Sequence, residues 1–586
     1  MATSVQLDVN QKSFAITFVH NPDIRYDQNY GTYFAPLWAY TLASHVSDNW
    51  SVTICDCKID NIHEVVRSDV FAFSGINQDI DSIRKAHDLV KEKYPDSTFI
   101  LGGPITWSLR EEGKLSYLQY FDYIFIMDGE ETLPMFLRAF EDASYTDLPQ
   151  IIEAEARFPI QQAKNIRIDL LKPKIEHYYG AVLEVSRGCP FLCEFCDIRV
   201  LPGNNQSNNK PVSLIIEELD QYHKLGITQI QFACDNFIGE VAWARECVDA
   251  IVSWRKRTGA KISIFTWLTI NLYKMPDLMH KMWEAGFSLL FIGIESVNQN
   301  SLLETAKVQN VEVLDQAVRT IQSYGFIIAP GMIFGFDSDT ETVFEETLDF
   351  FVDVGLIGGD PSFLMALSGT PLYRRMEQTG RLIKREEEVT VRKKIETNIR
   401  YLQDAEFLKK GFVDFIHRYT EPGFQFTRFK KHLDLIMESD TFIPIDHVGY
   451  GSPLEYLKIQ IKDAQNRKMF MLRIAYLIRK PSTISAVLKA WWLARKCSKR
   501  YQGLDIHLNY WLYVWTNIGL KYWGIKEEDF DIHSVGEDFD FNLLTQEIRP
   551  SKGQPLEKQK RGEEKTEIQA RYTRKALKRL LETKQN

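Results

Sequence analysis

Short apolar runs alternate with helical patterns along most of this 586-residue chain. Between residues 14 and 140 the runs are FAITFVH, VTICDC, VFAFSGI, TFILGGP and YIFIMDG, and helical patterns fall near Leu37–Val46 and Ile80–Lys93. Strands separated by helices predict a parallel sheet, because a parallel pair needs a crossover connection. This first series therefore predicts a doubly wound α/β domain that binds ligands at the carboxyl ends of its strands.

A second alternating series begins after a polar, proline-containing stretch at residues 144–174. Its apolar runs are AVLEVSRG, IQFACD, ISIFTWL, FIGIES, IIAPGMIFGF and PSFLMAL, with helical patterns at Leu214–Leu225 and Val241–Lys256. About six parallel strands with intervening helices predict a full or partial (β/α) barrel. The ligands of such a barrel gather at the carboxyl ends of its strands.

Glycines and strand-like apolar runs become less frequent beyond residue 385, where patterns such as Phe407–Tyr419 indicate a helical region. The last residues are highly charged, with one helical pattern at Tyr572–Leu581. The length exceeds what one hydrophobic core usually organises. We therefore expect a Rossmann-like domain at 1–145, a linker at 146–177, a barrel at 178–384, a mostly helical domain at 385–549 and a flexible tail at 550–586.

Composition excludes several classes of protein. The chain has 79 acidic and 70 basic residues and a net charge of -9, so we expect no nucleic-acid partner. The amino terminus carries no secretory signal pattern, and no apolar run reaches the ~18 residues of a membrane span. Eight cysteines are too few for a disulfide framework, which favours a reducing compartment and a cytoplasmic location.

Three cysteines stand within eight residues in the segment VSRGCPFLCEFCD, directly after the first strand of the second series. Cys189, Cys193 and Cys196 have the spacing CxxxCxxC. Gly188 and Pro190 shape a loop that can wrap thiolates around a metal cluster. Three thiolates on a four-iron, four-sulfur cluster leave one iron open for a small-molecule ligand.

A structural zinc site and free buried thiols are the alternatives to a cluster. A structural zinc site has four protein ligands, usually in two pairs. The sequence has no second compact pair, and only Cys234 or His177 remains to complete such a site. The close spacing of three cysteines without a partner pair therefore favours the iron–sulfur cluster.

The cysteine motif resembles the signature of the radical S-adenosylmethionine (radical SAM) superfamily. This resemblance implies that S-adenosylmethionine chelates the open iron through its amino and carboxylate groups. Reduction by a donor such as flavodoxin or ferredoxin then cleaves the sulfonium and gives a 5'-deoxyadenosyl radical. It also implies that Cys189, Cys193 and Cys196 form the catalytic metal centre and that Phe195 packs near the adenine.

Further motifs with the same resemblance stand at strand ends: FACDNFIG at the second, FIGIES at the fourth and GMIFGFDSDT at the fifth. Glycines there let the backbone approach a ligand closely. Glu295 can accept hydrogen bonds from ribose hydroxyls, and a structural role is its alternative. The expected cofactor contacts besides Phe195 are Asp235, Asn236, Gly293, Glu295, Ser296, Gly331 and Gly335.

Together with LSGTPLYRRMEQTGRL and SLLETAKVQN, these motifs are similar to those of cobalamin-type radical SAM enzymes, including the hopanoid C-methylases. This resemblance covers about residues 14–385 and implies that the first domain binds cobalamin. The loops LGGP and DGEET predict cobalamin contacts from Gly102, Gly103, Gly129 and Glu130. The sequence lacks the DxHxxG motif that would mark a lower axial ligand, and His20 is either a substitute or only a polar loop residue.

The resemblance implies C-methylation of an unactivated carbon in a small-molecule, lipid-like or natural-product substrate. One S-adenosylmethionine methylates cobalamin, and a second supplies the radical that removes a substrate hydrogen. The alternative is another radical transformation, such as hydroxylation, cyclisation, rearrangement or epimerisation, with an altered cobalamin domain. A non-catalytic protein that keeps a cluster as a sensor is a third class, but it has no need of the strand-end motifs.

Three features of the sequence each allow two interpretations. Cys234 stands where the related pattern has an acidic residue, and it is either an apolar filler or a substrate-facing thiol. The aromatic stretch His507–Ile525 either packs as a buried helix or lines an apolar pocket. The segment Lys468–Lys480 has basic ends around an apolar body, which indicates core packing or a peripheral membrane contact.

Overall fold

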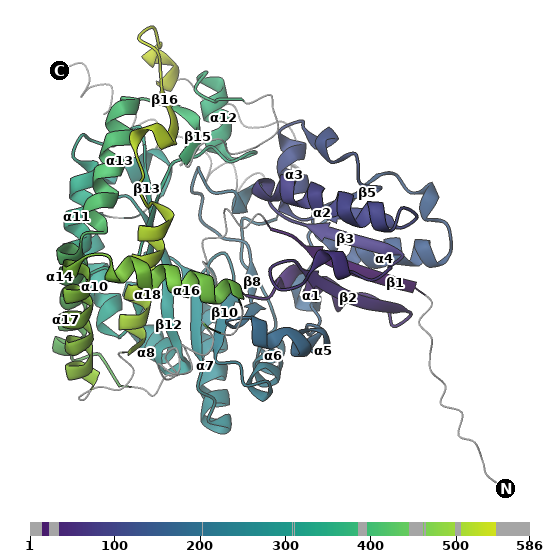
Figure 1. The fold of residues 1–586 in the computed structure, drawn as a ribbon, viewed down its shortest axis with the longest axis horizontal. Coiled ribbons are helices and arrows are strands. Elements are labelled where there is room, and N and C mark those ends of the chain that lie inside the picture. The colour runs from purple at the N-terminus through teal and green to yellow at the C-terminus, as the bar shows by residue number, and fades with distance from the viewer. Residues whose placement is uncertain are drawn as a thin grey trace. The chain divides into compact units, whose positions relative to one another are not determined.

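The computed structural model describes residues 14–22, 34–201, 203–307, 309, 311–384, 395–444, 461, 464–498 and 505–545. These residues form two compact units (Figure 1). The first unit contains the described residues up to Tyr178, and the second contains those from Tyr179 onward. The expected tail at 550–586 and its helix Tyr572–Leu581 lie outside the described residues.

The first unit is built on a six-stranded sheet with the order β2-β1-β3-β4-β5-β6, and every neighbouring pair is parallel. The strands are β1 Phe14–His20, β2 Trp50–Asp56, β3 Val70–Ser74, β4 Thr98–Gly102, β5 Tyr123–Ile126 and β6 Ile151–Glu153. The order reverses between β1 and β3, which is the switch point of a doubly wound sheet. The predicted doubly wound domain is confirmed.

The helices of this unit are α1 Leu37–Ala43, α2 Ile80–Lys93, α3 Pro104–Glu111, α4 Gly129–Glu141 and α5 Ile168–Leu171. The segment expected as a linker supplies β6, which pairs with β5 and buries Ile152. The hydroxyl of Tyr178 donates to Asp56 Oδ2 at 2.9 Å. The first unit therefore continues past residue 145, because these later residues complete its sheet and its core.

The second unit contains six parallel strands in the order β7-β10-β11-β12-β13-β14, which is their order along the chain. Their bounds are β7 Ala181–Glu184, β10 Gln229–Ala233, β11 Ser263–Leu268, β12 Phe287–Glu295, β13 Ile327–Phe334 and β14 Asp360–Phe363. Within the described part of the chain β7 and β14 pair on one side only. This is the expected partial barrel, with the three strand-end motifs after its second, fourth and fifth strands.

Helices connect successive barrel strands (Figure 1). They are α6 Val212–Lys224, α7 Val241–Thr258, α8 Pro276–Ala285, α9 Gln299–Glu304, α10 Leu314–Ser323 and α11 Val343–Asp353, and α12 Pro371–Gln378 follows the last strand. In α10 the buried positions Leu314, Val318 and Ile321 recur at helical spacing, so one face packs inward. A short antiparallel pair, β8 Ser186–Arg187 with β9 Asn208–Asn209, flanks the cysteine loop.

The region after residue 394 is mostly helical, as predicted. Its helices are α13 Ala405–Tyr419, α14 Pro422–Glu438, α16 Ala464–Ile478, α17 Pro481–Ser498 and α18 Asp505–Lys521. A small parallel pair, β15 Ile395–Tyr401 with β16 Phe530–Ser534, adds to them. In α18 the buried Trp511 ring stacks on Phe429 of α14, with centroids 4.8 Å apart. None of the described helices is long and apolar enough to cross a lipid bilayer.

Candidate active site

The cysteine loop begins directly after β8 with a glycine that no other residue can replace without strain. Gly188 has a φ of 89°, and a Cβ atom there would lie 2.2 Å from the carbonyl oxygen of Gln206. Its N–H donates to Asp235 Oδ2 at 2.5 Å. The N–H of Cys189 donates to the carbonyl of Asn204 at 2.9 Å. Backbone hydrogen bonds thus hold the first cysteine at the carboxyl end of the barrel.

The three cysteine thiols are half-buried, and none of them forms a disulfide. The N–H of Cys196 donates to the carbonyl of Cys193 at 3.2 Å, which folds the loop back on itself. Burial raises the pKa of Cys189 and of Cys196, and the neighbouring Cys193 thiol raises both further. Each thiol loses its proton when it ligates a metal, so a bound cationic centre would offset the burial and mutual repulsion that raise these pKa values.

The residues around the loop fit an iron–sulfur cluster. The amide of Asn236 donates toward Cys189 Sγ over 3.9 Å, and Asn236 Oδ1 is buried without a hydrogen-bond partner among the residues that the structure describes. In the same part of the chain no three His, Cys, Asp or Glu side chains converge on a single metal ion. A four-iron cluster binds each thiolate at a different iron, whereas zinc needs all its ligands around one ion. The donor set therefore fits the cluster better than zinc.

Cys234, one of the two residues that could complete a zinc site, has other partners. Its Sγ lies 3.2 Å from Thr266 Oγ1 and 3.6 Å from the carbonyl oxygen of Trp267, both on β11. Burial raises the pKa of this thiol to about 12. Cys234 is therefore a protonated thiol that bonds to the neighbouring strand.

An ion pair between Glu295 and Lys307 occupies the end of β12. Glu295 has a φ of 67°, a left-handed conformation that non-glycine residues adopt rarely and mostly at functional sites. Lys307 Nζ donates to Glu295 Oε1 at 2.6 Å, and both side chains are largely buried. A Cβ atom at Gly293 would lie 2.3 Å from Glu295 Oε1, and one at Gly331 would lie 3.4 Å from Oε2. The two strand-end glycines thus make room for the Glu295 carboxylate.

Lys307 is a site residue that the sequence analysis did not single out. Burial lowers its pKa, but the Glu295 carboxylate and the thiols of Cys193 and Cys196 raise it more, so its pKa lies above the ordinary lysine value. Its ammonium group therefore adds a positive charge beside the cysteine loop. The segment SLLETAKVQN contained this lysine, but nothing local distinguishes it from a solvent-exposed one.

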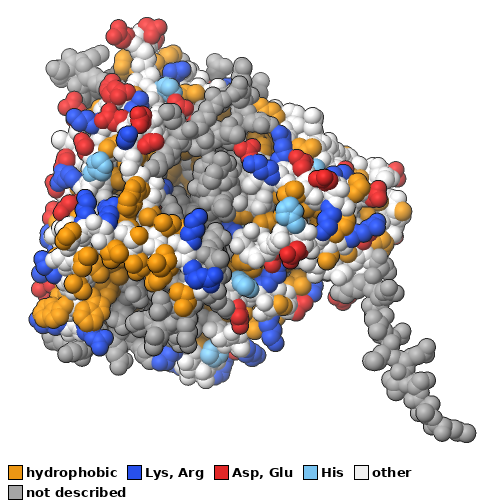
Figure 2. All heavy atoms as spheres, viewed as in Figure 1, with side chains coloured by type: hydrophobic (Ala, Val, Ile, Leu, Met, Phe, Trp, Pro, Cys, Tyr) orange, Lys and Arg blue, Asp and Glu red, His pale blue; other side chains and the backbone are white. Residues whose placement is uncertain are grey.

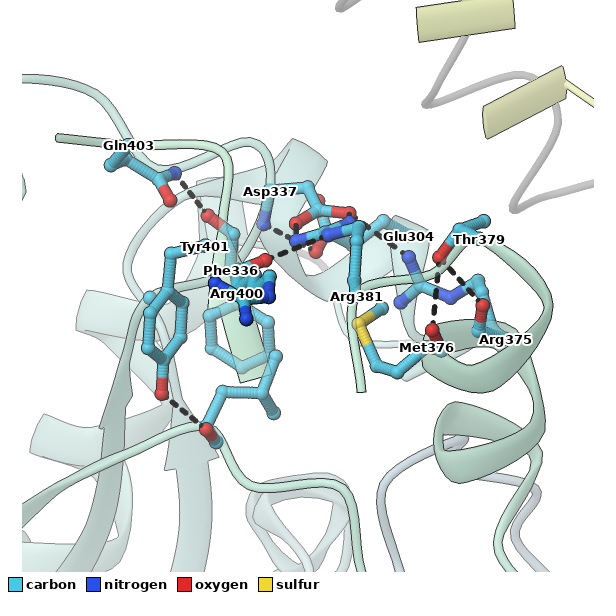
Figure 3. Close-up of polar contacts among 12 residues, drawn as sticks. Glu304, Phe336, Asp337, Arg375, Met376, Thr379, Arg381, Arg400, Tyr401 and Gln403 are labelled. Carbon is cyan, nitrogen blue, oxygen red and sulfur yellow. Dashed lines mark hydrogen bonds and ion pairs between the residues drawn. The ribbon is translucent and has the colours of Figure 1, made fainter. Parts of the chain in front are cut away.

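A buried ion network anchors the cysteine loop to the end of the barrel. Glu194 lies between two of the cysteines, and its carboxylate accepts from Arg375 Nε and Nη2 at 2.9 Å each. Arg375 Nη1 also donates to Asp337 Oδ2 at 3.0 Å, and Arg381 donates to both oxygens of Asp337 (Figure 3). The N–H of Glu194 donates to the carbonyl of Thr305. The loop conformation therefore depends on α12 and on the segment after β13.

Two further carboxyl groups surround this network. Glu304 accepts from the backbone N–H groups of Asp337 and Ser338 at 2.8 Å each. Burial, reinforced by the Asp337 charge, raises the pKa of Glu304 to about 8, and burial raises that of Asp339 to about 7. Asp337 itself keeps a lowered pKa of about 2, because Arg381 and Arg375 outweigh its burial.

Three other barrel residues that are expected to contact the cofactors are Phe195, Gly335 and Ser296. The rings of Phe195 and Phe336 have centroids 6.3 Å apart. Gly335 has a φ of 91°, and a Cβ atom there would lie 2.6 Å from the Tyr401 ring. Ser296 is buried, and its hydroxyl accepts from the N–H of Asn298 at 3.0 Å. The roles of these residues in cofactor binding stay predictions.

In the first unit the predicted glycines lie at the carboxyl ends of strands. Gly102 ends β4, and Gly103 follows it with a φ of 88°. A Cβ atom at Gly103 would lie 2.2 Å from the hydroxyl of Ser74, the last residue of β3. The glycine therefore lets the ends of β3 and β4 approach beside the switch point.

Gly129 and Glu130 begin α4, and Glu130 is buried. A Cβ atom at Gly129 would lie 3.1 Å from Leu42 of α1. His20 ends β1, and its Nδ1 accepts from the indole N–H of Trp38 at 3.3 Å. Cobalamin contacts from all four predicted residues stay predictions, as does the substitution of His20 for the missing motif.

Two family models match this chain. Residues 183–351 match the radical SAM superfamily, and residues 370–494 match a domain of unknown function, DUF4070. The chain is 30% identical over 381 residues to the hopanoid C-2 methylase of Rhodopseudomonas palustris, covering 64% of this chain and 69% of that protein. It is 28% identical over 352 residues to an uncharacterized methyltransferase of Synechocystis, covering 59% of this chain and 64% of that protein.

Two solved structures share the fold. The cobalamin-dependent S-adenosylmethionine radical enzyme OxsB, with aqua-cobalamin and S-adenosylmethionine bound, has a TM-score of 0.57 at 16% identity, over 87% of this chain and 84% of that chain. The radical S-adenosylmethionine methyltransferase TsrM from Kitasatospora setae has a TM-score of 0.52 at 14% identity, over 64% of this chain and 76% of that chain.

The chain has the fold of a (β/α) enzyme, a partial barrel with three cysteines in the loop after its first strand. The chain belongs to the radical SAM superfamily, in the group that contains hopanoid C-2 methylase. The resemblance drawn from the cysteine motif is thereby confirmed.

Proposed function

We propose that this enzyme is a cobalamin-dependent C-methyltransferase that acts on an unactivated carbon of an apolar small molecule. One observation carries the proposal: a chain with both a doubly wound unit and a cysteine-bearing partial barrel is 30% identical over 381 residues to a hopanoid C-2 methylase. The match covers more of the chain than the radical SAM segment at 183–351.

The cysteine loop is the part of the chain that would hold the [4Fe–4S] cluster, through Cys189, Cys193 and Cys196. When bound, the cluster and S-adenosylmethionine supply one-electron cleavage of a sulfonium, and cobalamin supplies methyl transfer. The protein would orient the cofactors and the substrate and shield the radical from solvent. The Arg375 pair with Glu194 holds the loop, and the buried Lys307 ammonium offsets negative charge on the thiolates.

The carboxyl ends of β1, β3 and β4 would hold cobalamin. They border the switch point of the sheet, where open α/β sheets bind ligands. Gly103 carries no side chain at this edge, and a Cβ atom there would clash with the Ser74 hydroxyl. A glycine at a strand end suits a large ligand that must approach the backbone closely.

The electron donor and the location follow from the chemistry that we propose. Cleavage of the sulfonium requires one electron from a low-potential protein such as flavodoxin or ferredoxin. Thiol ligation requires a reducing compartment, and we place the enzyme in the cytoplasm. The substrate is a small molecule, and its apolar character rests on the relative's name alone.

Cofactor stoichiometry tests the proposal. The protein is purified without oxygen, its cluster is reconstituted, and hydroxocobalamin is added before desalting. We expect about four irons per chain and near-stoichiometric cobalt, and both S-adenosylhomocysteine and 5'-deoxyadenosine after reduction with S-adenosylmethionine. Iron without cobalt, with 5'-deoxyadenosine alone, would replace methylation by another radical transformation.

The cysteine variants provide the matched control. Replacing Cys189, Cys193 and Cys196 together by Ala should remove the iron, the brown absorbance and the cleavage of S-adenosylmethionine, while the circular dichroism spectrum stays that of a folded protein. Cys234→Ala should keep the full iron content, because its thiol bonds to Thr266 and not to the loop. Cleavage retained in the triple variant would overturn the assignment of the loop.

A further inference from the structure

Helix α17 packs in the opposite sense to an ordinary surface helix. A helix at a protein surface normally turns its large apolar residues toward the core. The face of α17 that is buried consists of small or short residues, namely Thr483, Ala486, Ala490, Ala494 and Cys497. This face packs on α14. Ile484, Leu488, Trp491 and Trp492 are exposed, so these large apolar side chains lie away from the buried face.

The exposed fractions confirm this inversion. Leu488 and Trp492 are 60% and 63% exposed, and Trp491 is 49% exposed. Helix α16, which contacts α17, exposes Met471 and Ile478 to the same degree. The exposed large apolar side chains of α16, of α17 and of the residue shortly after α18 define what we call the α16–α18 surface. Its members are Met471, Leu472, Ile478, Ile484, Leu488, Trp491, Trp492 and Trp523.

The apolar side chains of this surface form a patch rather than isolated contacts with solvent. Figure 2 shows orange side chains gathered where Figure 1 places α16, α17 and α18, on the left of the molecule. The three helices contact one another, so their exposed faces are continuous. Contiguous apolar patches on soluble proteins usually mark an interaction site.

The charge of this surface identifies the kind of partner. Residues 464–498 contain no Asp or Glu, although the whole chain has a net charge of -9. Their exposed basic residues are Arg467, Lys468, Arg479, Lys480, Lys489, Arg495 and Lys496, whereas Arg473 is buried. The partner must therefore be anionic as well as apolar.

Cations and aromatic rings lie side by side on this surface. Arg495 lies 5.7 Å from the Trp491 ring, Lys496 lies 5.6 Å from the Trp492 ring, and Arg479 lies 4.9 Å from the Trp523 ring. Tryptophan with adjacent Lys or Arg is the combination found where proteins meet the headgroup region of a bilayer. The centres of protein–protein interfaces are instead depleted in lysine.

We propose that the α16–α18 surface docks this enzyme on an anionic lipid bilayer. The exposed Trp, Leu and Ile side chains enter the boundary between headgroups and acyl chains, and the basic side chains contact the lipid phosphates. No spanning helix is needed, because the contact involves one face of the helices only. The docking does not depend on the proposed methyl transfer, since none of these residues belongs to the cysteine site.

Vesicle flotation with the full-length, cluster-reconstituted protein under anaerobic conditions tests the proposal. The probes are vesicles of phosphatidylcholine alone and vesicles that also contain phosphatidylglycerol. We expect the protein to float with the anionic vesicles at low salt and to be released by high salt. Arg495→Gln with Lys496→Gln should weaken binding about 25-fold, because each cation contributes about fivefold. Trp491→Ser with Trp492→Ser should lower the fraction of protein that floats with the anionic vesicles at low salt.

Matched variants separate docking from folding. Val66→Ser with Leu89→Ser changes exposed apolar residues of the first unit and should float as the wild type does. Leu488→Ser and Trp523→Ser test the surface from separate segments, and each should weaken binding. All variants should keep the wild-type iron content and 5'-deoxyadenosine formation in the absence of lipid.

Three results would overturn the proposal. The first is no flotation with anionic vesicles at low salt. The second is flotation of the Trp491→Ser, Trp492→Ser variant at the wild-type level. The third is a wild-type dimer in analytical ultracentrifugation that this variant converts to a monomer, because a second copy of the chain would then cover the surface.

Discussion

The guanidinium group of Arg375 forms a bidentate ion pair with the carboxylate of Glu194, with both N···O distances at 2.9 Å. The two residues are 181 positions apart, and each side chain is only 3% exposed. Glu194 lies between two of the three cysteines of the loop. A residue of α12, within the segment that matches a domain of unknown function, therefore holds the loop that would bind the cluster.

Arg375→Met should destabilise the protein and impair cluster assembly. The change leaves the Glu194 carboxylate buried without its partner, which costs about 3–5 kcal/mol. We expect a lower thermal midpoint and less than half the wild-type iron content after reconstitution. The double variant Glu194→Gln with Arg375→Met should regain part of the stability, because it removes the unpaired charge.

The neighbouring Arg374 offers the control for this variant. Its guanidinium donates to the carbonyl of Gly369 at 2.7 Å, and its replacement leaves the Arg375 pair with Glu194 in place. Arg374→Met should therefore keep the wild-type iron content. An Arg375→Met protein with unchanged iron content and thermal midpoint would contradict the anchoring role.

Lys307→Met should allow the cluster to form but reduce its chemistry. The variant removes the hydrogen bond to Glu295 and a positive charge beside the cysteines, and a hydrogen bond to a charged group contributes about 10- to 100-fold. We expect 5'-deoxyadenosine formation to fall by that factor, and Lys307→Arg to retain more activity. Lys281→Met, on the outer helix α8, is the control. Equal rates for Lys307→Met and wild type would remove Lys307 from the site.

Gly188→Ala should prevent the cysteine loop from closing, and Gly226→Ala separates this effect from backbone strain. Both glycines have a positive φ, 89° and 75°. A Cβ atom at Gly188 would meet the Gln206 carbonyl at 2.2 Å, whereas one at Gly226 has nothing within 4 Å. The strain of about 1–2 kcal/mol is common to both variants. Iron content should therefore fall in Gly188→Ala alone, and a similar loss in both would refute the steric argument.

His432 should make the protein less stable in mild acid. Its burial, reinforced by the charge of Arg428, lowers its pKa from 6.5 to about 3. Its ring bonds to Gln322 and to His507, both buried. Between the two pKa values the unfolded chain binds more protons than the folded one, so stability is complete above pH 6.5 and falls as the pH drops toward 3.

Urea unfolding at about pH 7.5 and about pH 5.5 measures this effect. The wild-type midpoint should fall more between the two conditions than that of His432→Asn. His417→Asn changes an exposed residue of α13 and should follow the wild type. The same pH dependence in His432→Asn and wild type would show that the buried ring contributes nothing to it.

Local patterns predicted most of the fold. The helix expected at Ile80–Lys93 has those bounds in the structure, because one apolar face recurs at helical spacing. The strand-end motifs lie after the second, fourth and fifth barrel strands as expected, because the apolar run before each motif marks a strand. The segment 146–177 was misjudged as a linker because its strand, Ile151–Glu153, is too short to show a period.

The α/β class, the two parallel sheets and the cysteine loop could be predicted from the spacing of near neighbours in the chain. The pairing of Lys307 with Glu295, the anchoring of Glu194 by Arg375, and the burial of alanines and exposure of tryptophans in α17 could not. Each of these depends on which distant segment packs against a residue. A local pattern gives the faces of an element, but the packing of the whole chain decides which face is buried.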